Sequence, residues 1–290
     1  MPDLPTSSAP PVTRARRLAA ALSPTFDSYY LMSAFLLVLF LISYIWWPLA
    51  EEYLSYIPWQ GAWWRYMDWL LLGIFLAMSA LIMAGANLRA DVKIVLVGFA
   101  GGLVIEGWGT QTNIWHYFTA ERPPLWIIPA WPIASLSIDR LVRILDIASG
   151  REHAHAHPAQ PKPGLGLQIA YWLVFGAFYA LMLVFVAPTF DKSLTLAALF
   201  LVAFLILTPT DHRLALLTFA AGAGLGYFLE LWGTTRECWT YYTGQTPPLF
   251  AVLAHGMAAV SFWRSVRLIE MLLDKVIRAR HGQATQSPVN

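Results

Sequence analysis

The stretch Glu106–Tyr117 reads EGWGTQTNIWHY, and the stretch Glu230–Tyr241 reads ELWGTTRECWTY. A shift of 124 positions (230 − 106) superimposes them, and the match runs without a gap from Glu106–Arg143 to Glu230–Arg267, with 16 of 38 positions identical. Each copy contains an apolar segment that ends in a carboxylate, an aromatic loop and a pair of prolines before the next apolar segment. The chain is therefore predicted to contain an internal repeat that arose by gene duplication.

The composition is typical of an integral membrane protein. Hydrophobic residues make up 58% of the 290 residues and charged residues only 12%, whereas soluble domains carry about a quarter charged residues. The 14 tryptophans suit a protein that anchors itself at two water–lipid interfaces. A net charge of +2 gives no reason to expect a nucleic acid partner. The single cysteine, Cys238, excludes an intramolecular disulfide.

Eight apolar segments are long enough to cross the membrane, which takes about 20 residues. They are residues 30–49, 67–86, 92–110, 124–145, 167–188, 194–210, 214–234 and 248–272. The predicted fold is an all-α polytopic membrane helix bundle of about eight transmembrane helices, arranged as two parallel four-helix repeats. Its expected parts are a polar cytoplasmic N-terminal segment (1–29), the first repeat (30–148), a Pro/His-rich cytoplasmic linker (149–166), the second repeat (167–273) and a polar cytoplasmic tail (274–290).

The distribution of basic residues predicts the orientation. With the N-terminus inside, the inner segments hold fifteen Lys and Arg residues and the outer loops hold four. The positive-inside rule then places both termini in the cytoplasm and the protein in the cell membrane. Because four spans return the chain to the same side, the two repeats share one orientation and are related by a pseudo-twofold axis along the membrane normal.

Glu106 and Glu230 are the main candidate functional residues. Each is preceded by glycines eight and four positions earlier, which lie on the same helix face and allow another helix to approach closely. Both glutamates are therefore predicted to face protein in the outer half of the bilayer, where an ionisable group is a functional candidate. The alternative is a structural anchor, or an ion pair with Arg122 or Arg236.

His255 marks the most informative difference between the two repeats, because the corresponding residue of the first repeat is Trp131. His255 is expected near the depth of Glu230, where a histidine beside a carboxylate forms an acid–base pair. The alternative is a histidine that only satisfies a structural hydrogen bond. Glu106, Glu230 and His255 are the candidate catalytic residues.

Aromatic and hydroxyl residues surround each glutamate in the sequence. We interpret them as the mouth of a site for an apolar or cationic ligand, with an interfacial aromatic belt as the alternative. The candidate ligand-binding residues are Trp108, Thr110, Trp115, Tyr117, Trp131, Trp232, Thr234, Trp239 and Tyr241.

Two further groups are interpreted as structural. Arg140, Arg143, Arg264 and Arg267 are expected to anchor the inner interface, with a phosphate or lipid head-group site as the alternative. The run His153-x-His155-x-His157 could bind a metal, but it lies among linker prolines and is interpreted as part of a soluble linker.

The pattern of an intramembrane Glu, a Gly three residues on, Trp-x-Tyr and a Pro/Trp-rich helix start resembles integral membrane carotenoid-biosynthesis proteins of the acyclic carotenoid hydratase type. It is carried by Glu106, Gly109, Trp115, Tyr117, Pro129 and Trp131, and in the second half by Glu230, Gly233, Trp239 and Tyr241. The second half lacks equivalents of Pro129 and Trp131, and that family is not obviously a tandem duplication. The resemblance implies a cofactor-free enzyme that protonates or hydrates a polyene through a buried carboxylic acid.

The sequence thus favours a membrane protein that binds, and as an enzyme would act on, a lipid-like or isoprenoid molecule near the outer leaflet. Glu106 and Glu230 would serve as acid, base or polar anchor, with no cofactor, no metal and no nucleic acid partner. Two other classes remain open, a proton-coupled small-molecule transporter and a non-catalytic membrane assembly subunit. No particular oligomeric state is predicted.

Overall fold

The computed structural model describes residues 13–150 and 163–284, and most of these residues are helical. The expected all-α class is confirmed, apart from two short strands. The elements are α1 (Arg14–Leu22), α2 (Phe26–Ile45), α3 (Trp47–Ser55), η1 (Trp63–Arg65), α4 (Trp69–Met83), α5 (Leu88–Gln111), β1 (Trp115–Tyr117), α6 (Ala130–Ala148), α7 (Leu165–Val186), η2 (Ala187–Thr189), α8 (Ser193–Leu207), α9 (His212–Thr235), β2 (Trp239–Tyr241) and α10 (Leu249–Ala284).

Four helical segments of the described chain are long and apolar enough to cross a membrane. They are Phe26–Ile45, Leu165–Thr189, His212–Thr235 and Leu249–Arg278, while α4 and α8 are apolar but shorter. Large apolar side chains such as Phe40 on α2 and Phe200 on α8 point outward. A helix with exposed apolar residues suits hydrocarbon rather than water, so these are the features of a helical membrane protein.

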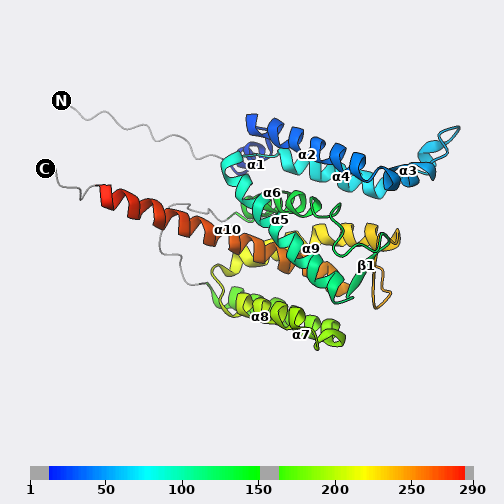
Figure 1. Ribbon diagram of the computed structural model, residues 1–290. Coiled ribbons are helices and arrows are strands. Elements are labelled where there is room, and N and C mark those ends of the chain that lie inside the picture. The colour runs from blue at the N-terminus through cyan, green and yellow to red at the C-terminus, as the bar shows by residue number, and fades with distance from the viewer. Residues whose placement is uncertain (1–12, 151–162, 285–290) are drawn as a thin grey trace, which may run out of the picture.

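The helices form three layers (Figure 1). α2 and α4 pack together on one side, α7 lies beside α8 on the other, and α5, α6, α9 and α10 lie between them. Within the central layer, α6 packs against α5 and α9, and α10 packs against the same two helices. The helices that carry Glu106 and Glu230 are therefore held in the middle of the molecule.

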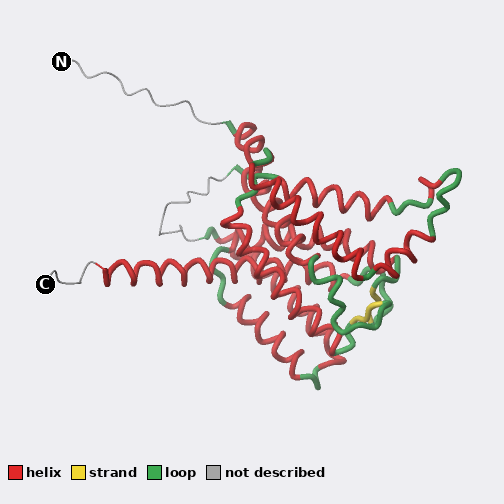
Figure 2. Tube along the Cα trace, turned by 45° about the horizontal axis from the view of Figure 1, so that its top comes forward, coloured by secondary structure: helices red, strands yellow, loops and turns green. Residues whose placement is uncertain are grey.

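The strands β1 and β2 pair antiparallel, with Trp115 opposite Tyr241, His116 opposite Thr240 and Tyr117 opposite Trp239. This two-stranded ribbon lies at the end of the molecule opposite the C-terminal end of α10 (Figure 2). The start of α1 lies at the same end as the C-terminal end of α10. The ribbon ties together two loops that are far apart in the sequence.

Matching residues of the two stretches adopt matching local geometry. α5 and α9 each have 24 residues and begin and end 124 positions apart. Asn87 and Asp211 cap them, because each side-chain oxygen accepts hydrogen bonds from the backbone N–H groups two and three residues later. Both helices are followed by a residue in the left-handed conformation, Asn113 with φ 60° and Glu237 with φ 57°.

Several segment boundaries differ from the prediction. The segment expected at 124–145 becomes a continuous helix only at Ala130, because prolines before it lack a donor and disfavour helix in the preceding residue. The expected polar segment 1–29 contains α1 and the start of α2, and the expected tail from residue 274 is helical through Ala284. The helix α3 was not predicted. Each of the other seven expected segments begins within a few residues of the first residue of a helix.

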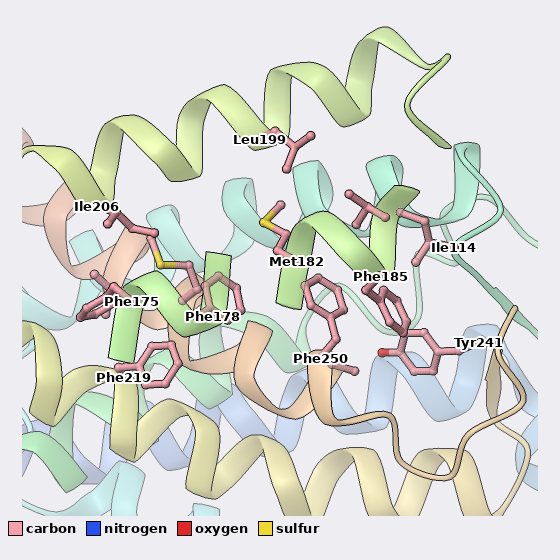
Figure 3. Packing of buried hydrophobic residues seen from close by; sticks show 14 of the residues in the cluster. Ile114, Phe175, Phe178, Met182, Phe185, Leu199, Ile206, Phe219, Tyr241 and Phe250 are labelled. Carbon is pink, nitrogen blue, oxygen red and sulfur yellow. The ribbon is translucent and has the colours of Figure 1, made fainter. Parts of the chain in front are cut away.

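The largest apolar core lies where α7 meets α8, α9 and α10 (Figure 3). Phe175, Phe178, Met182 and Phe185 recur every three or four residues along α7 and so occupy one face of the helix. Phe185 also packs on Phe250 of α10, with ring centroids 4.4 Å apart. This core holds α10 and the second strand in place.

The arginines predicted to anchor the inner interface bind protein groups instead of lying open to an anion. The buried Arg140 guanidinium lies 2.6 Å from Asp91 and 2.8 Å from Asp139. Its counterpart Arg264 donates to the Leu205 carbonyl oxygen at 2.6 Å, and Arg143 donates to the carbonyl oxygens of Ala84 and Gly85. The structure therefore supports a packing role for Arg140, Arg143 and Arg264 rather than a phosphate site, whereas the exposed Arg267 pairs with Glu270 at 3.3 Å.

Candidate functional site

Glu106 lies on α5, is only 4% exposed and accepts three hydrogen bonds. Its Oε2 atom accepts from Trp115 Nε1 at 3.1 Å and from the Tyr117 hydroxyl at 2.9 Å, both on β1. Its Oε1 atom accepts from Trp131 Nε1 of α6 at 3.0 Å. Both oxygens of this carboxyl group therefore face donors from two other elements.

Glu230 has the same arrangement on α9 and is 3% exposed. Its Oε2 atom accepts from Trp239 Nε1 at 2.9 Å, and its Oε1 atom accepts from the Tyr241 hydroxyl at 2.8 Å. His255 of α10 takes the place of Trp131, with Nε2 at 3.0 Å from Oε1. The predicted pairing of His255 with Glu230 is confirmed as a hydrogen bond. Within the part of the chain that the structure describes, neither glutamate forms an ion pair with Arg122 or Arg236, and Arg236 pairs with Asp68 instead.

Glycines on the glutamate faces make room for these partners. A Cβ atom on Gly109 or Gly233 would lie 1.9 or 2.0 Å from the ring of Trp115 or Trp239. A Cβ atom on Gly102 would lie 2.5 Å from Trp131, and a Cβ atom on the matching Gly226 would lie 2.4 Å from His255. Gly98 and Gly222, one turn earlier, meet the backbones of α6 and α10, which confirms the predicted close approach of helices.

The two glutamate clusters join at the centre of the molecule. Trp131 stacks on His255, with ring centroids 5.6 Å apart and planes 18° apart. Across the ribbon, Trp115 contacts Tyr241 at 5.8 Å between centroids, and Tyr117 contacts Trp239 at the same distance. Each half therefore supplies rings that pack against the other half, and the two clusters form one continuous site.

A cavity of about 1070 Å³ borders both clusters and is lined mostly by apolar side chains. Among the predicted site residues it is lined by Glu106, Trp108, Trp115, Tyr117, Trp131, Glu230, Trp232, Trp239, Tyr241 and His255. Thr110 and Thr234 do not line the cavity. Their hydroxyl groups donate to the backbone carbonyl oxygens of Glu106 and Glu230, one helical turn earlier, at 2.6 Å. These two threonines belong to the helices rather than to a ligand surface.

Asp68 is a residue near the site that the sequence analysis missed. It precedes α4, and its Oδ2 atom accepts from Trp232 Nε1 and Arg236 Nε of the second half, both at 2.9 Å. Burial favours a higher pKa for Asp68, but hydrogen bonds from the Leu71 N–H, Arg236 and Trp232 outweigh it and hold the pKa below its usual value. No local pattern signals these contacts, because the partners lie far along the chain.

The two carboxyl groups differ in what their partners can do. Indole N–H groups only donate, so the Glu106 oxygens that face Trp131 and Trp115 must accept. His255 can donate or accept at Nε2 according to its tautomer and charge. The partner of Glu230 on α10 can therefore reverse its donor and acceptor roles, whereas the partner of Glu106 on α6 cannot.

Within residues 13–150 and 163–284, no group of three His, Cys, Asp or Glu side chains is placed to hold a metal ion. The histidines 153, 155 and 157 lie outside the described residues. Comparison with protein-family models, curated proteins and solved structures finds no match in any of the three. The fold and the site thus define a helical membrane protein with two carboxyl groups on one internal cavity.

Cys238, between α9 and β2, is expected to react slowly with thiol reagents. Burial, followed by the nearby Asp68 charge, raises its pKa from 9.0 to about 11. The thiolate is the reactive form, so two pKa units lower its population roughly 100-fold at pH 7.5. The mass shift from a maleimide measures this directly, because the chain has a single cysteine. Folded protein that reacts as fast as protein unfolded in SDS would contradict the buried position.

Proposed function

We propose that this protein binds a lipid-like or isoprenoid molecule in the central cavity, with Glu106 and Glu230 as polar anchors. The observation that supports it is a cavity of about 1070 Å³ whose walls are mostly apolar and whose charged lining groups are these two buried glutamates. Cavities of roughly 300–1000 Å³ with a few convergent polar groups are typical ligand sites. The apolar walls favour a ligand that dissolves in the bilayer.

We place α2, α4 and α5–α10 across the cell membrane as eight spans in two parallel four-helix repeats, with both termini in the cytoplasm. The basic residues support this orientation, because fifteen Lys and Arg residues fall in the inner segments and four in the outer loops. The matching caps and lengths of α5 and α9 support the repeat. The ribbon and the aromatic loops would then lie near the outer leaflet.

If the protein is an enzyme, the Glu230–His255 pair is its acid–base group. In the hydration of a polyene, the pair would give a proton to one carbon of a double bond, water would add to the other carbon, and the pair would then take back the proton that the added water loses. The resemblance to acyclic carotenoid hydratases supports a carotenoid-type ligand and a cofactor-free hydratase, isomerase or cyclase. The pair lies on the cavity wall, where a ligand could reach it.

A proton-coupled transporter is the second candidate, and the same pair favours it. A carboxyl group and a histidine that share a hydrogen bond at 3.0 Å form a natural proton carrier within a membrane. A non-catalytic assembly subunit is the third. It is favoured by the exposed apolar residues in the second half of α10, including Leu268, Met271 and Leu272.

Mass spectrometry and an absorption spectrum of the apolar molecules retained after mild detergent purification test the proposed function. We expect a stoichiometric isoprenoid or other lipid-like molecule, and its loss from the Glu106→Gln, Glu230→Gln double variant because the polar anchors change. Bulk phospholipid alone, or unchanged retention and turnover in a folded double variant, would refute it. Proton-dependent uptake into liposomes would instead favour the transporter.

A further inference from the structure

Residues of α5 and α8 line the cavity and also reach the surface of the molecule. On α5, Val104 borders the cavity and is 67% exposed; on α8, Leu201 borders it and is 54% exposed. Ala100 and Ala197 also line the cavity and are exposed at the surface. The central cavity is therefore open at the surface between these two helices.

Two rows among the lining residues define a slot between α5 and α8. Of the α5 residues that line the cavity, Ala100, Val104, Gly107 and Gln111 form one row, and of the α8 residues, Leu194, Ala197 and Leu201 form the other. Steps of three and four residues keep each row on one helix face. The α5 row runs over eleven residue steps, from Ala100 to Gln111, or about 16 Å.

α10 forms the floor of the slot, and a hydrogen bond joins its walls near one end. Ala258, Ser261, Phe262 and Ser265 line it from α10, at positions i, i+3, i+4 and i+7 of one helix face. Near the C-terminal end of α5, Trp108 Nε1 donates to Thr195 Oγ1 of α8 at 3.2 Å. The slot is therefore bounded by α5 and α8 at its sides and by α10 at its base, and the Trp108–Thr195 hydrogen bond joins α5 to α8.

The slot leads from a lipid-facing surface to the two carboxyl groups. Glu106 directly precedes Gly107. Among the described residues that line the cavity none is Lys, Arg or Asp, and Glu106 and Glu230 are the acidic ones. A water-soluble ligand would meet apolar walls along this path, whereas a molecule dissolved in the bilayer would lose no hydration there. The carboxyl group of Glu106 accepts from three donors, and that of Glu230 accepts from two and shares a hydrogen bond with His255, so a ligand group that reaches either carboxylate must donate.

We propose that the α5–α8 slot is the lateral opening through which a single-chain amphiphile reaches the site from the bilayer. Its apolar chain lies along the slot, and its hydrogen-bond-donating head, an alcohol in the simplest case, lies at Glu106 and Glu230. This proposal rests on the proposed function and adds the class of ligand and its route.

Gly107→Trp tests the slot with little risk to folding. No heavy atom lies within 4 Å of a Cβ atom built on Gly107, so an indole there would fill the slot rather than disturb packing. Gly176→Trp on α7 is the matched control, because Gly176 is equally free but does not line the cavity. The ligand probe is a hexadecanol that carries a mid-chain diazirine, cross-linked by light in detergent and mapped by mass spectrometry.

We expect labelled peptides from residues 97–108 of α5 and 194–202 of α8. Labelling there should fall about tenfold or more in Gly107→Trp and stay within about twofold in Gly176→Trp, a difference of at least about 1 kcal/mol in binding. Equal labelling in the two variants would overturn the proposal. So would labelling of the slot no stronger than that of the outward face of α2, which measures general contact with lipid.

The double variant Glu106→Gln, Glu230→Gln separates this inference from the proposed function. If it keeps the slot labelling that Gly107→Trp loses, the slot stands and the role of the glutamates as anchors fails. If it loses the labelling while Gly107→Trp keeps it, the glutamates bind the ligand and the proposed route is wrong.

Discussion

Glu106→Gln is expected to destabilise the folded protein by about 1–3 kcal/mol, while Glu230→Gln is expected to cost less than about 1 kcal/mol. The reason is the chemistry of the partner from the neighbouring helix, which is Trp131 for Glu106 and His255 for Glu230. In Glu106→Gln the amide NH₂ must face an indole N–H, from either Trp131 or Trp115, and neither can accept a hydrogen bond. A buried donor is then left unsatisfied.

In Glu230→Gln the amide NH₂ can take the position of Oε1, which faces Tyr241 and His255. The hydroxyl oxygen of Tyr241 and an unprotonated Nε2 of His255 can both accept. The hydrogen bonds therefore rearrange without leaving a buried group unpaired. Thermal or denaturant unfolding in detergent measures the two free energies.

Exchange of the third partner provides the controls. Adding His255→Trp to Glu230→Gln should raise its cost toward that of Glu106→Gln, because an indole donor then faces the amide. Adding Trp131→His to Glu106→Gln should recover stability relative to Glu106→Gln with the native tryptophan. Equal and small costs for the two single Gln variants would contradict this account of the indole partners.

Asp91→Ala is expected to destabilise the protein by about 3–5 kcal/mol, because it removes one partner of a buried ion pair. Arg140 is 2% exposed and lies 2.6 Å from Asp91. After the replacement only Asp139 would remain beside the guanidinium. The lost ion pair also connects α5 to α6, the two helices that carry Glu106 and Trp131.

The partly exposed pair Lys93–Glu270 is the matched control, since such pairs contribute about 0–1 kcal/mol. Glu270→Ala should therefore shift the unfolding midpoint much less than Asp91→Ala. Adding Arg140→Met to Asp91→Ala should recover much of the loss, because no unpaired charge stays buried. Equal shifts for Asp91→Ala and Glu270→Ala would contradict this account.

Local patterns in the sequence predicted the helices and the faces that their glutamates occupy. Glycines at steps of four define one helix face, and the structure finds Glu106 and Glu230 on it, turned toward protein. The alignment of the two stretches also singled out Trp131 and His255 as matching positions. Helix ends were predicted less well. The prolines before Ala130 delay the start of α6, and α10 continues as a helix to Ala284, beyond the predicted apolar segment.

Spacing along the chain by itself determines which residues share a helix face, and for this protein that was enough to identify the carboxyl groups and their glycines. Only the tertiary structure decided which residues meet across the molecule. The pairing of β1 with β2, the stacking of Trp131 on His255, the pairing of Arg140 with Asp91 and the slot between α5 and α8 all depend on the angles and offsets at which helices pack. Those quantities arise from contacts between distant segments, so no local pattern encodes them.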